Sequence, residues 1–305
     1  MRDVIGSYKN GNYTVVILSD GTMIRSCKDD IMIPEFPDSM DIKITNKCSG
    51  GTNCKYCHEN SSPDGLHGKI LNVPLLNSLK PYTQLAVGGG NVLEHPDFIP
   101  FLIWCKEKNL IPSITLNQKH FMENLQLVKD LVDKKLIYGI GVSLIYPTDE
   151  LINAVREFPN AVIHVIAGIV SKTELDRISD RGIKMLILGY KQFRRGEDFY
   201  KSSPETQRRI DSNINWLRDN LCDVAYHFDK VTFDNLDIKQ LDVKSIMSED
   251  AWKRFYMGDD GQFTMYVDAV NEEYAVSSTS RKRFKYNDES TIEDIFATVK
   301  SEARR

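Results

Sequence analysis

Short apolar runs alternate with longer amphipathic segments through the middle of the chain. Six runs have the length and composition of buried strands, and they cover residues 42–45, 85–87, 111–116, 138–145, 161–169 and 183–188. Five segments repeat apolar residues at helical spacing, which predicts helices over 98–108, 121–135, 149–157, 172–179 and 205–220. Because strands joined by helical crossovers pair in parallel, the pattern predicts an α/β fold with a parallel sheet.

Two of these helices have clear start signals. Ser171-Lys-Thr-Glu174 is a capping-box pattern, and Thr148 can cap the helix that follows it. Six βα units form either an open doubly wound sheet or a partial barrel, and periodicity does not separate the two. In both architectures ligands collect at the carboxyl ends of the strands, so functional residues are expected there.

The two ends of the chain follow a different pattern. Residues 12–26 alternate around Asp20-Gly21, which predicts a hairpin, and 263–268 with 273–277 predict a second one. Ser290-Thr-Ile-Glu293 opens a last helix. We therefore expect three parts: an N-terminal hairpin cover at 1–38, a core at 39–222 and a small α+β C-terminal extension at 223–305.

Composition places the chain among ordinary globular proteins. Of its 305 residues, 41% are hydrophobic and 27% are charged. No apolar run approaches the roughly 18 residues of a membrane span, and the first residues lack the apolar segment of a secretion signal, so a cytoplasmic location without membrane attachment is predicted. A net charge of -4 disfavours nucleic acid as a partner. The basic clusters Arg194-Arg195 and Arg281-Lys282-Arg283, with Lys285, are predicted to be solvated surface.

Three cysteines gather directly after the first core strand. Cys48, Cys54 and Cys57 lie within ten residues, and Gly50 and Gly51 between them allow a loop to curl. Thiolates bind zinc or iron–sulfur clusters, and three ligands rather than four leave one coordination position open. Two other interpretations remain: reduced thiols that lie together by chance, and a zinc knuckle completed by His58.

This loop resembles the cysteine motif of the radical SAM enzyme superfamily. That family has an aromatic residue before the last cysteine, where this chain has Tyr56, although five residues rather than three separate the first two cysteines here. The resemblance implies a partial (βα)6 barrel and a [4Fe-4S] cluster on Cys48, Cys54 and Cys57. It also implies S-adenosylmethionine (SAM) on the open iron, an external electron donor and abstraction of hydrogen from a substrate C–H bond.

Five further strand ends carry candidate SAM contacts. The second core strand runs into Gly88-Gly89-Gly90-Asn91, where the family has Gly-Gly-Glu to hold the SAM amino group, so Asn91 takes the place of the glutamate. The resemblance places Asn117 and Ser143 near the SAM carboxylate and ribose, Gly168 near adenine and Tyr190 at the pocket mouth. The alternative to SAM binding is a structural role for these residues, as a turn residue, a glycine turn or a core hydroxyl with its hydrogen bonds satisfied.

The C-terminal hairpin and helix faintly resemble the SPASM-type extension of peptide-modifying radical SAM enzymes. Cys222 is the last cysteine, so the tail lacks the ligands of extra clusters and a single cluster is expected. The resemblance favours a peptide or protein substrate, with another small molecule, a nucleotide or a nucleic-acid base as alternatives. A rival from another class is a noncatalytic zinc-binding regulatory module. The remaining cysteines, Cys27, Cys105 and Cys222, are predicted to pack, and the six histidines to be structural or exposed.

Overall fold

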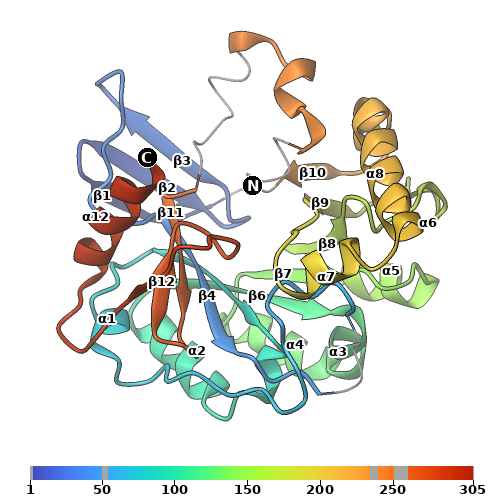
Figure 1. Ribbon diagram of the computed structural model, residues 1–305. Helices are drawn as coiled ribbons and strands as arrows, with labels where there is room; N and C mark the ends of the chain where they lie inside the picture. Colours follow the sequence, from blue (N-terminus) through green and yellow to red (C-terminus); the bar gives the residue numbers. More distant parts are fainter. Residues whose placement is uncertain (1–2, 50–53, 234–239, 251–259, 305) are drawn as a thin grey trace.

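Ten strands form one mixed, mostly parallel sheet, and three more form a separate antiparallel sheet at the N-terminus (Figure 1). The computed structural model describes residues 3–49, 54–233, 240–250 and 260–304. The small sheet has the order β1-β2-β3, with bounds Val4–Asn10, Tyr13–Leu18 and Met23–Cys27. The predicted hairpin is therefore β2 and β3, and β1 adds a third strand that the sequence pattern did not indicate.

All six predicted core strands are present, pair in parallel and follow chain order. They are β4 (Ser39–Thr45), β5 (Gln84–Gly89), β6 (Ile111–Asn117), β7 (Gly139–Ser143), β8 (Ala161–Ile166) and β9 (Lys184–Leu188). The sheet then extends at both edges. β10 (Lys230–Phe233) pairs with β9, and β11 (Thr264–Asp268) pairs in parallel with β4, followed by β12 (Glu273–Ala275) and β13 (Phe284–Lys285).

The predicted helices are also present, with one correction. The stretch expected as a single helix over 121–135 is two helices, because the side-chain amide of Asn124 donates to the carbonyl of His120 at 2.8 Å and ends the first of them. The capping box of Ser171 and Glu174 and the Thr148 cap are confirmed. The helices are α1 (Pro74–Asn77), η1 (Val92–Glu94), α2 (Phe98–Glu107), α3 (Gln118–Glu123), α4 (Leu125–Asp133), α5 (Asp149–Arg156), α6 (Lys172–Ile178), α7 (Arg195–Tyr200), α8 (Pro204–Asp219), α9 (Leu221–Tyr226), η2 (Val243–Ile246) and α12 (Ile292–Ala303).

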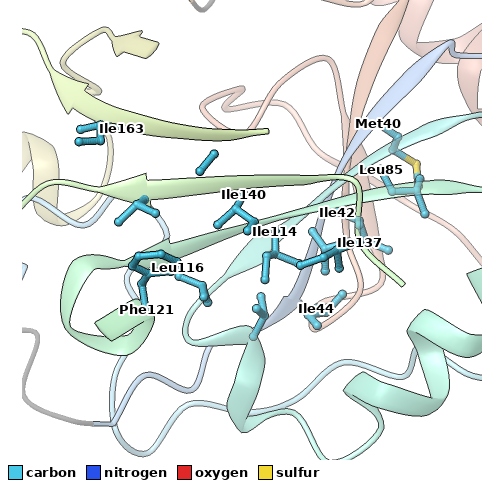
Figure 2. Packing of buried hydrophobic residues seen from close by; sticks show 14 of the residues in the cluster. Met40, Ile42, Ile44, Leu85, Ile114, Leu116, Phe121, Ile137, Ile140 and Ile163 are labelled. Carbon is cyan, nitrogen blue, oxygen red and sulfur yellow. The ribbon is translucent and has the colours of Figure 1, made fainter. Parts of the chain in front are cut away.

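The core lies between the sheet and the helices along its outer face. Ile42 on β4, Ile114 on β6 and Ile140 on β7 belong to one buried cluster, and Figure 2 shows them there. Successive strand residues point to opposite faces, so the residues between them face the inside of the curve. On β4, β5 and β7 that inner face is polar or small, with Lys43 and Asp41 on β4, Gly88 on β5 and Gly141 on β7. On β8 and β9 it also carries Ile166 and Leu188.

Contacts between distant strand ends show that the sheet curls. Lys191 follows β9 and donates to the hydroxyl of Ser278, which follows β12, at 3.2 Å. These two strands are separated by seven steps in the sheet order, which would span more than about 30 Å in a flat sheet at about 4.8 Å per step. The predicted partial barrel of parallel strands is therefore confirmed, with the β9–α7 connection reaching toward the loop after β12 (Figure 1).

The structure confirms one prediction about side chains and corrects two others. Cys105 is buried in the core as predicted, but Cys222 is exposed, because it lies on the solvent side of the short helix α9. The basic clusters are not simply solvated surface. Arg194, Arg195 and Arg283 are half-buried, because the curl of the sheet brings their loops together, whereas Arg281 is exposed.

Within the described residues, no helix combines the length and apolar character needed to cross a bilayer.

Candidate functional site

The cysteine loop leaves the carboxyl end of β4 and returns beside it. Cys48 N–H donates to the carbonyl of Ser62 at 2.8 Å, and Ser62 N–H donates to Asn46 at 3.0 Å, so the two arms run side by side. Cys57 N–H donates to the carbonyl of Cys54 at 3.0 Å, which places these two thiols in one tight turn. All three motif cysteines are half-buried thiols.

The donor chemistry of this loop fits an iron–sulfur cluster. Three thiols come from one short segment, and burial together with negative charge at Cys54, Glu174 and Cys57 raises the pKa of the Tyr56 phenol. No group of three metal-ligating side chains is already gathered among the described residues. Gly50 and Gly51 lie outside the described residues.

The glycines after β5 bring that strand end against the cysteine loop. A Cβ on Gly89 would lie 2.3 Å from the carbonyl oxygen of Thr45, and one on Gly90 would lie 2.0 Å from that of Lys47. Gly89 also has a φ of 114°, which favours glycine. A Cβ on Gly88, in contrast, would meet no atom within 4 Å. Gly89 and Gly90 are thus required by packing, whereas Gly88 leaves open space on the inner face.

Asn91 has structural partners in addition to the contact that the resemblance implies. Its Oδ1 caps η1 by accepting from Leu93 N–H at 3.3 Å, and its Nδ2 donates to Glu94 at 3.0 Å. Asn91 is buried at the start of this turn. Its amide oxygen is therefore already engaged with the backbone.

Glu94 is a functional candidate that the sequence reasoning missed. Its carboxylate accepts from Ser49 N–H at 3.0 Å, from the Ser49 hydroxyl and from Asn91. Burial opposes its ionisation, but these hydrogen bonds and the nearby His120 lower the pKa of Glu94 below its ordinary value. A carboxylate therefore lies beside the residue after Cys48. The Asn91-x-x-Glu94 spacing, which is that of a capping pair, was the available signal.

His120 holds the same loop from another side. Its Nε2 lies 3.1 Å from the carbonyl oxygen of Ser49, and the imidazole is buried at the start of α3. The prediction that His120 is structural is confirmed, as it is for buried His95, whose Nε2 lies 2.8 Å from the carbonyl oxygen of Gly68. Elements after β5 and β6 thus position the first motif cysteine.

Asn117 and Ser143 lie in one row at the carboxyl ends of neighbouring strands. Asn117 pairs with Ser143 across β6 and β7, and Ser143 pairs with His164 across β7 and β8. Asn117 also caps α3, since its Oδ1 accepts from Lys119 N–H at 3.0 Å. A Cβ on Gly141 would lie 2.2 Å from the His164 ring, so this imidazole lies over β7 on the inner face. The row has the polar character expected of a ligand-binding strand edge.

Gly168 and Tyr190 make packing contacts. A Cβ on Gly168, whose φ is 86°, would lie 2.7 Å from Ile210 on α8. Tyr190 is 3% exposed, its hydroxyl donates to the carbonyl of Gly196 at 2.8 Å, and burial together with Tyr56 and Tyr200 raises its pKa to about 12. Both residues therefore connect the sheet to the helices that follow it.

No protein-family model and no curated protein matches this chain. Solved structures of SuiB from Streptococcus suis do match it. SuiB bound to S-adenosylmethionine aligns with a TM-score of 0.57 and 15% identity over 89% of this chain and 68% of that one. SuiB bound to the precursor peptide SuiA aligns with a TM-score of 0.53 and 16% identity over 89% of this chain and 67% of that one. A further SuiB structure aligns with a TM-score of 0.56 and 14% identity over 99% of this chain and 89% of that one. At these identities the likeness establishes a shared fold.

Proposed function

We propose that this chain is a radical SAM enzyme that binds one [4Fe-4S] cluster through Cys48, Cys54 and Cys57. The observation that carries the proposal is their position: three thiols on the loop after the first strand of a parallel partial barrel, against the glycine-rich end of the next strand. When bound, the cluster would supply the electron that splits SAM into methionine and a 5′-deoxyadenosyl radical, which then takes a hydrogen atom from the substrate.

The side chains around the loop have separate tasks in this proposal. Gly88 leaves room for SAM to approach the backbone of β5, and the carboxylate of Glu94 attracts its ammonium group. Asn117 and Ser143 line the strand edge along which the rest of SAM would lie. Tyr56, which precedes the last cysteine, packs against α7, where its ring lies 5.9 Å from that of Phe199.

A peptide is the proposed substrate, with an external electron donor. The support is the shared fold with SuiB, which has been solved with its precursor peptide SuiA, over 89% of this chain. Polar side chains on the inner face of β4 and β6 offer hydrogen-bonding groups to an extended chain.

Anaerobic reconstitution with iron and sulfide tests the cofactor. We expect a brown protein with about four irons and four sulfides per chain that, once reduced, converts SAM to 5′-deoxyadenosine. Cys48→Ala, Cys54→Ala and Cys57→Ala should each abolish this conversion. Cys222→Ala, which changes an exposed cysteine outside the loop, is the matched control and should retain it.

The rival zinc module makes the opposite prediction. It requires His58 as a fourth ligand, but the Nε2 of His58 lies 3.4 Å from the carboxylate of Glu59. A colourless protein that holds one zinc ion per chain and does not cleave SAM would refute the enzyme proposal. Retained cleavage in one cysteine variant would remove only that residue from the ligand set.

A further inference from the structure

The residues that follow Cys57 enter a cluster of buried charges on the inner face of the sheet. Lys43 is 1% exposed, and its Nζ lies 3.3 Å from Glu59 and 3.1 Å from Asp268. Arg194 lies 3.6 Å from the same Glu59 carboxylate, which also accepts from the Tyr266 hydroxyl at 3.1 Å. The two carboxylates of this cluster are therefore already paired with cations.

Two more arginines join the cluster without a carboxylate of their own. Arg195 donates to the carbonyl of Ser61, and Arg283 donates to the carbonyl of Ser278. The Arg283 guanidinium lies 4.8 Å from the centre of the Tyr266 ring, which connects it to Glu59. Neither arginine forms an ion pair with any described residue. Asp41 pairs with Tyr266 across β4 and β11 and borders the cluster on the same face, so the signal is the two guanidinium groups without an ion pair rather than a net charge.

Three buried polar atoms around the Glu59–Ser61 segment have no hydrogen-bond partner among the described residues. They are Ser61 Oγ, Arg195 Nε and Arg283 Nη1. Ser61 is only 6% exposed, so water does not readily replace the missing partner. Buried guanidinium and hydroxyl groups are almost always satisfied. Two guanidinium groups without an ion pair, together with unsatisfied polar atoms, are what an anion-binding site looks like without its anion.

We propose that Ser61, Arg195 and Arg283 bind a carboxylate of the substrate, namely a glutamate or aspartate side chain of an acidic peptide. The inference rests on the proposed function, and it adds a substrate class to it. A guanidinium matches the planar carboxylate, and one negative charge suits a site that Glu59 and Asp268 border better than a doubly charged phosphate does. Ser61 is four residues past Cys57, so the bound side chain would be held close to the cluster loop.

Binding can be measured on the full chain without cluster, SAM or turnover. The protein is labelled with 15N-arginine, and the Nε–Hε signals of Arg195 and Arg283 are assigned from Arg195→Lys and Arg283→Lys. Acetyl-Ala-Glu-Ala amide should shift these signals saturably, and the matching glutamine peptide should bind about tenfold more weakly or worse, since it lacks the charge. Absence of a saturable shift, or equal binding of the two peptides, would overturn the proposal.

Variants separate the site from general surface charge. Arg283→Gln should weaken binding of the glutamate peptide about tenfold or more, whereas Arg281→Gln, at a 79% exposed side chain two residues away, should not change it. Ser61→Ala removes one hydroxyl with little risk to folding, and it should weaken binding of the glutamate peptide several-fold. This variant provides the test if Arg283→Gln does not fold.

Two further results identify the bound anion and separate failure of the acidic-peptide inference from failure of the proposed function. Tighter binding of inorganic phosphate than of the glutamate peptide at the same arginines would refute the carboxylate assignment. SAM cleavage in the absence of any peptide reports on the proposed function alone, so loss of peptide binding with SAM cleavage intact would overturn only the acidic-peptide inference.

Discussion

Glu94 connects the two loops from which the candidate site is built. It accepts hydrogen bonds from Ser49 and Asn91, so Glu94→Gln should replace one acceptor oxygen with a donor facing Ser49. We expect a loss of about 1–3 kcal/mol in unfolding free energy and less iron retained per chain after reconstitution. Denaturant titration and iron analysis measure the two effects.

The matched control is Glu123→Gln on α3. Glu123 is exposed and lies 3.9 Å from Lys119, so its loss should change stability by less than about 0.5 kcal/mol. Equal behaviour of the two variants would show that Glu94 does not hold the cysteine loop.

Two neighbouring glycines on β5 and its loop give a second residue-scale prediction. Gly90→Ala places a methyl group 2.0 Å from the Lys47 carbonyl, so the cysteine loop must move, and we expect a loss of more than about 1 kcal/mol in stability. Gly88→Ala meets nothing within 4 Å and should fold normally, but it should weaken SAM binding because it fills the space that SAM approaches. Calorimetric SAM titration of both variants tests this contrast, and unchanged affinity in Gly88→Ala would contradict the role of Gly88.

At the residue scale the sequence indicated the cysteine motif but not the buried charged residues near it. Cys48, Cys54 and Cys57 share one segment, so their spacing was visible along the chain. Lys43 and Asp268 are 225 residues apart, and only the pairing of β4 with β11 brings them within 3.1 Å. A buried ion pair of that kind has no local pattern, because neither residue type favours the interior until its partner is present.

Helix α6 carries the clearest local signal among the elements, and its start can be tested. Ser171 accepts from Glu174 N–H, and Glu174 accepts from Ser171 N–H at 2.8 Å. Ser171→Ala should therefore destabilise the protein by about 1 kcal/mol, measured by denaturant unfolding. Lys172→Ala, one residue into the same helix and exposed, is the control and should have little effect. Equal losses in the two variants would contradict the capping role.

Helices and strands could be predicted where the sequence pattern is local, but strand pairing between segments far apart in the sequence could not. Capping and period located α5, α6 and α8 and the six core strands. Strand β10, only four residues long, was not predicted, and β11 was predicted as a hairpin strand but not its pairing with β4, which lies more than 200 residues earlier. Parallel pairing over such a separation depends on the assembled core rather than on the strand's own residues.

On the scale of the whole molecule, the curl of the sheet determines which residues meet. The β9–α7 connection contacts the loop after β12, and this contact brings the basic clusters at 194–195 and 281–283 to one place. Composition alone treats such clusters as solvated, since each is short and polar along the chain. Their half-buried position follows from closure of the partial barrel, and periodicity could not establish that closure.

A buried carboxylate, Asp38, is one of the groups that attach the N-terminal sheet to the core. Asp38, which is 0% exposed, accepts from the hydroxyls of Tyr8 and Tyr13 at 2.8 Å and pairs with Arg25 at 2.5 Å. Asp38→Ala would remove the carboxylate that pairs with the buried Arg25 side chain, so we expect a loss of about 3–5 kcal/mol in unfolding free energy. Asp29→Ala, at an exposed position of the same N-terminal region, should cost less than about 0.5 kcal/mol.

A double variant distinguishes an attachment point from a general core defect. When Arg25→Leu is combined with Asp38→Leu, no buried charge is left without a partner, so the pair should lose less stability than the sum of the two single changes. Denaturant unfolding of all four proteins gives the coupling energy. Additive losses would mean that Arg25 and Asp38 act independently, and the N-terminal sheet would then be held by its apolar contacts through residues such as Tyr13 and Val15.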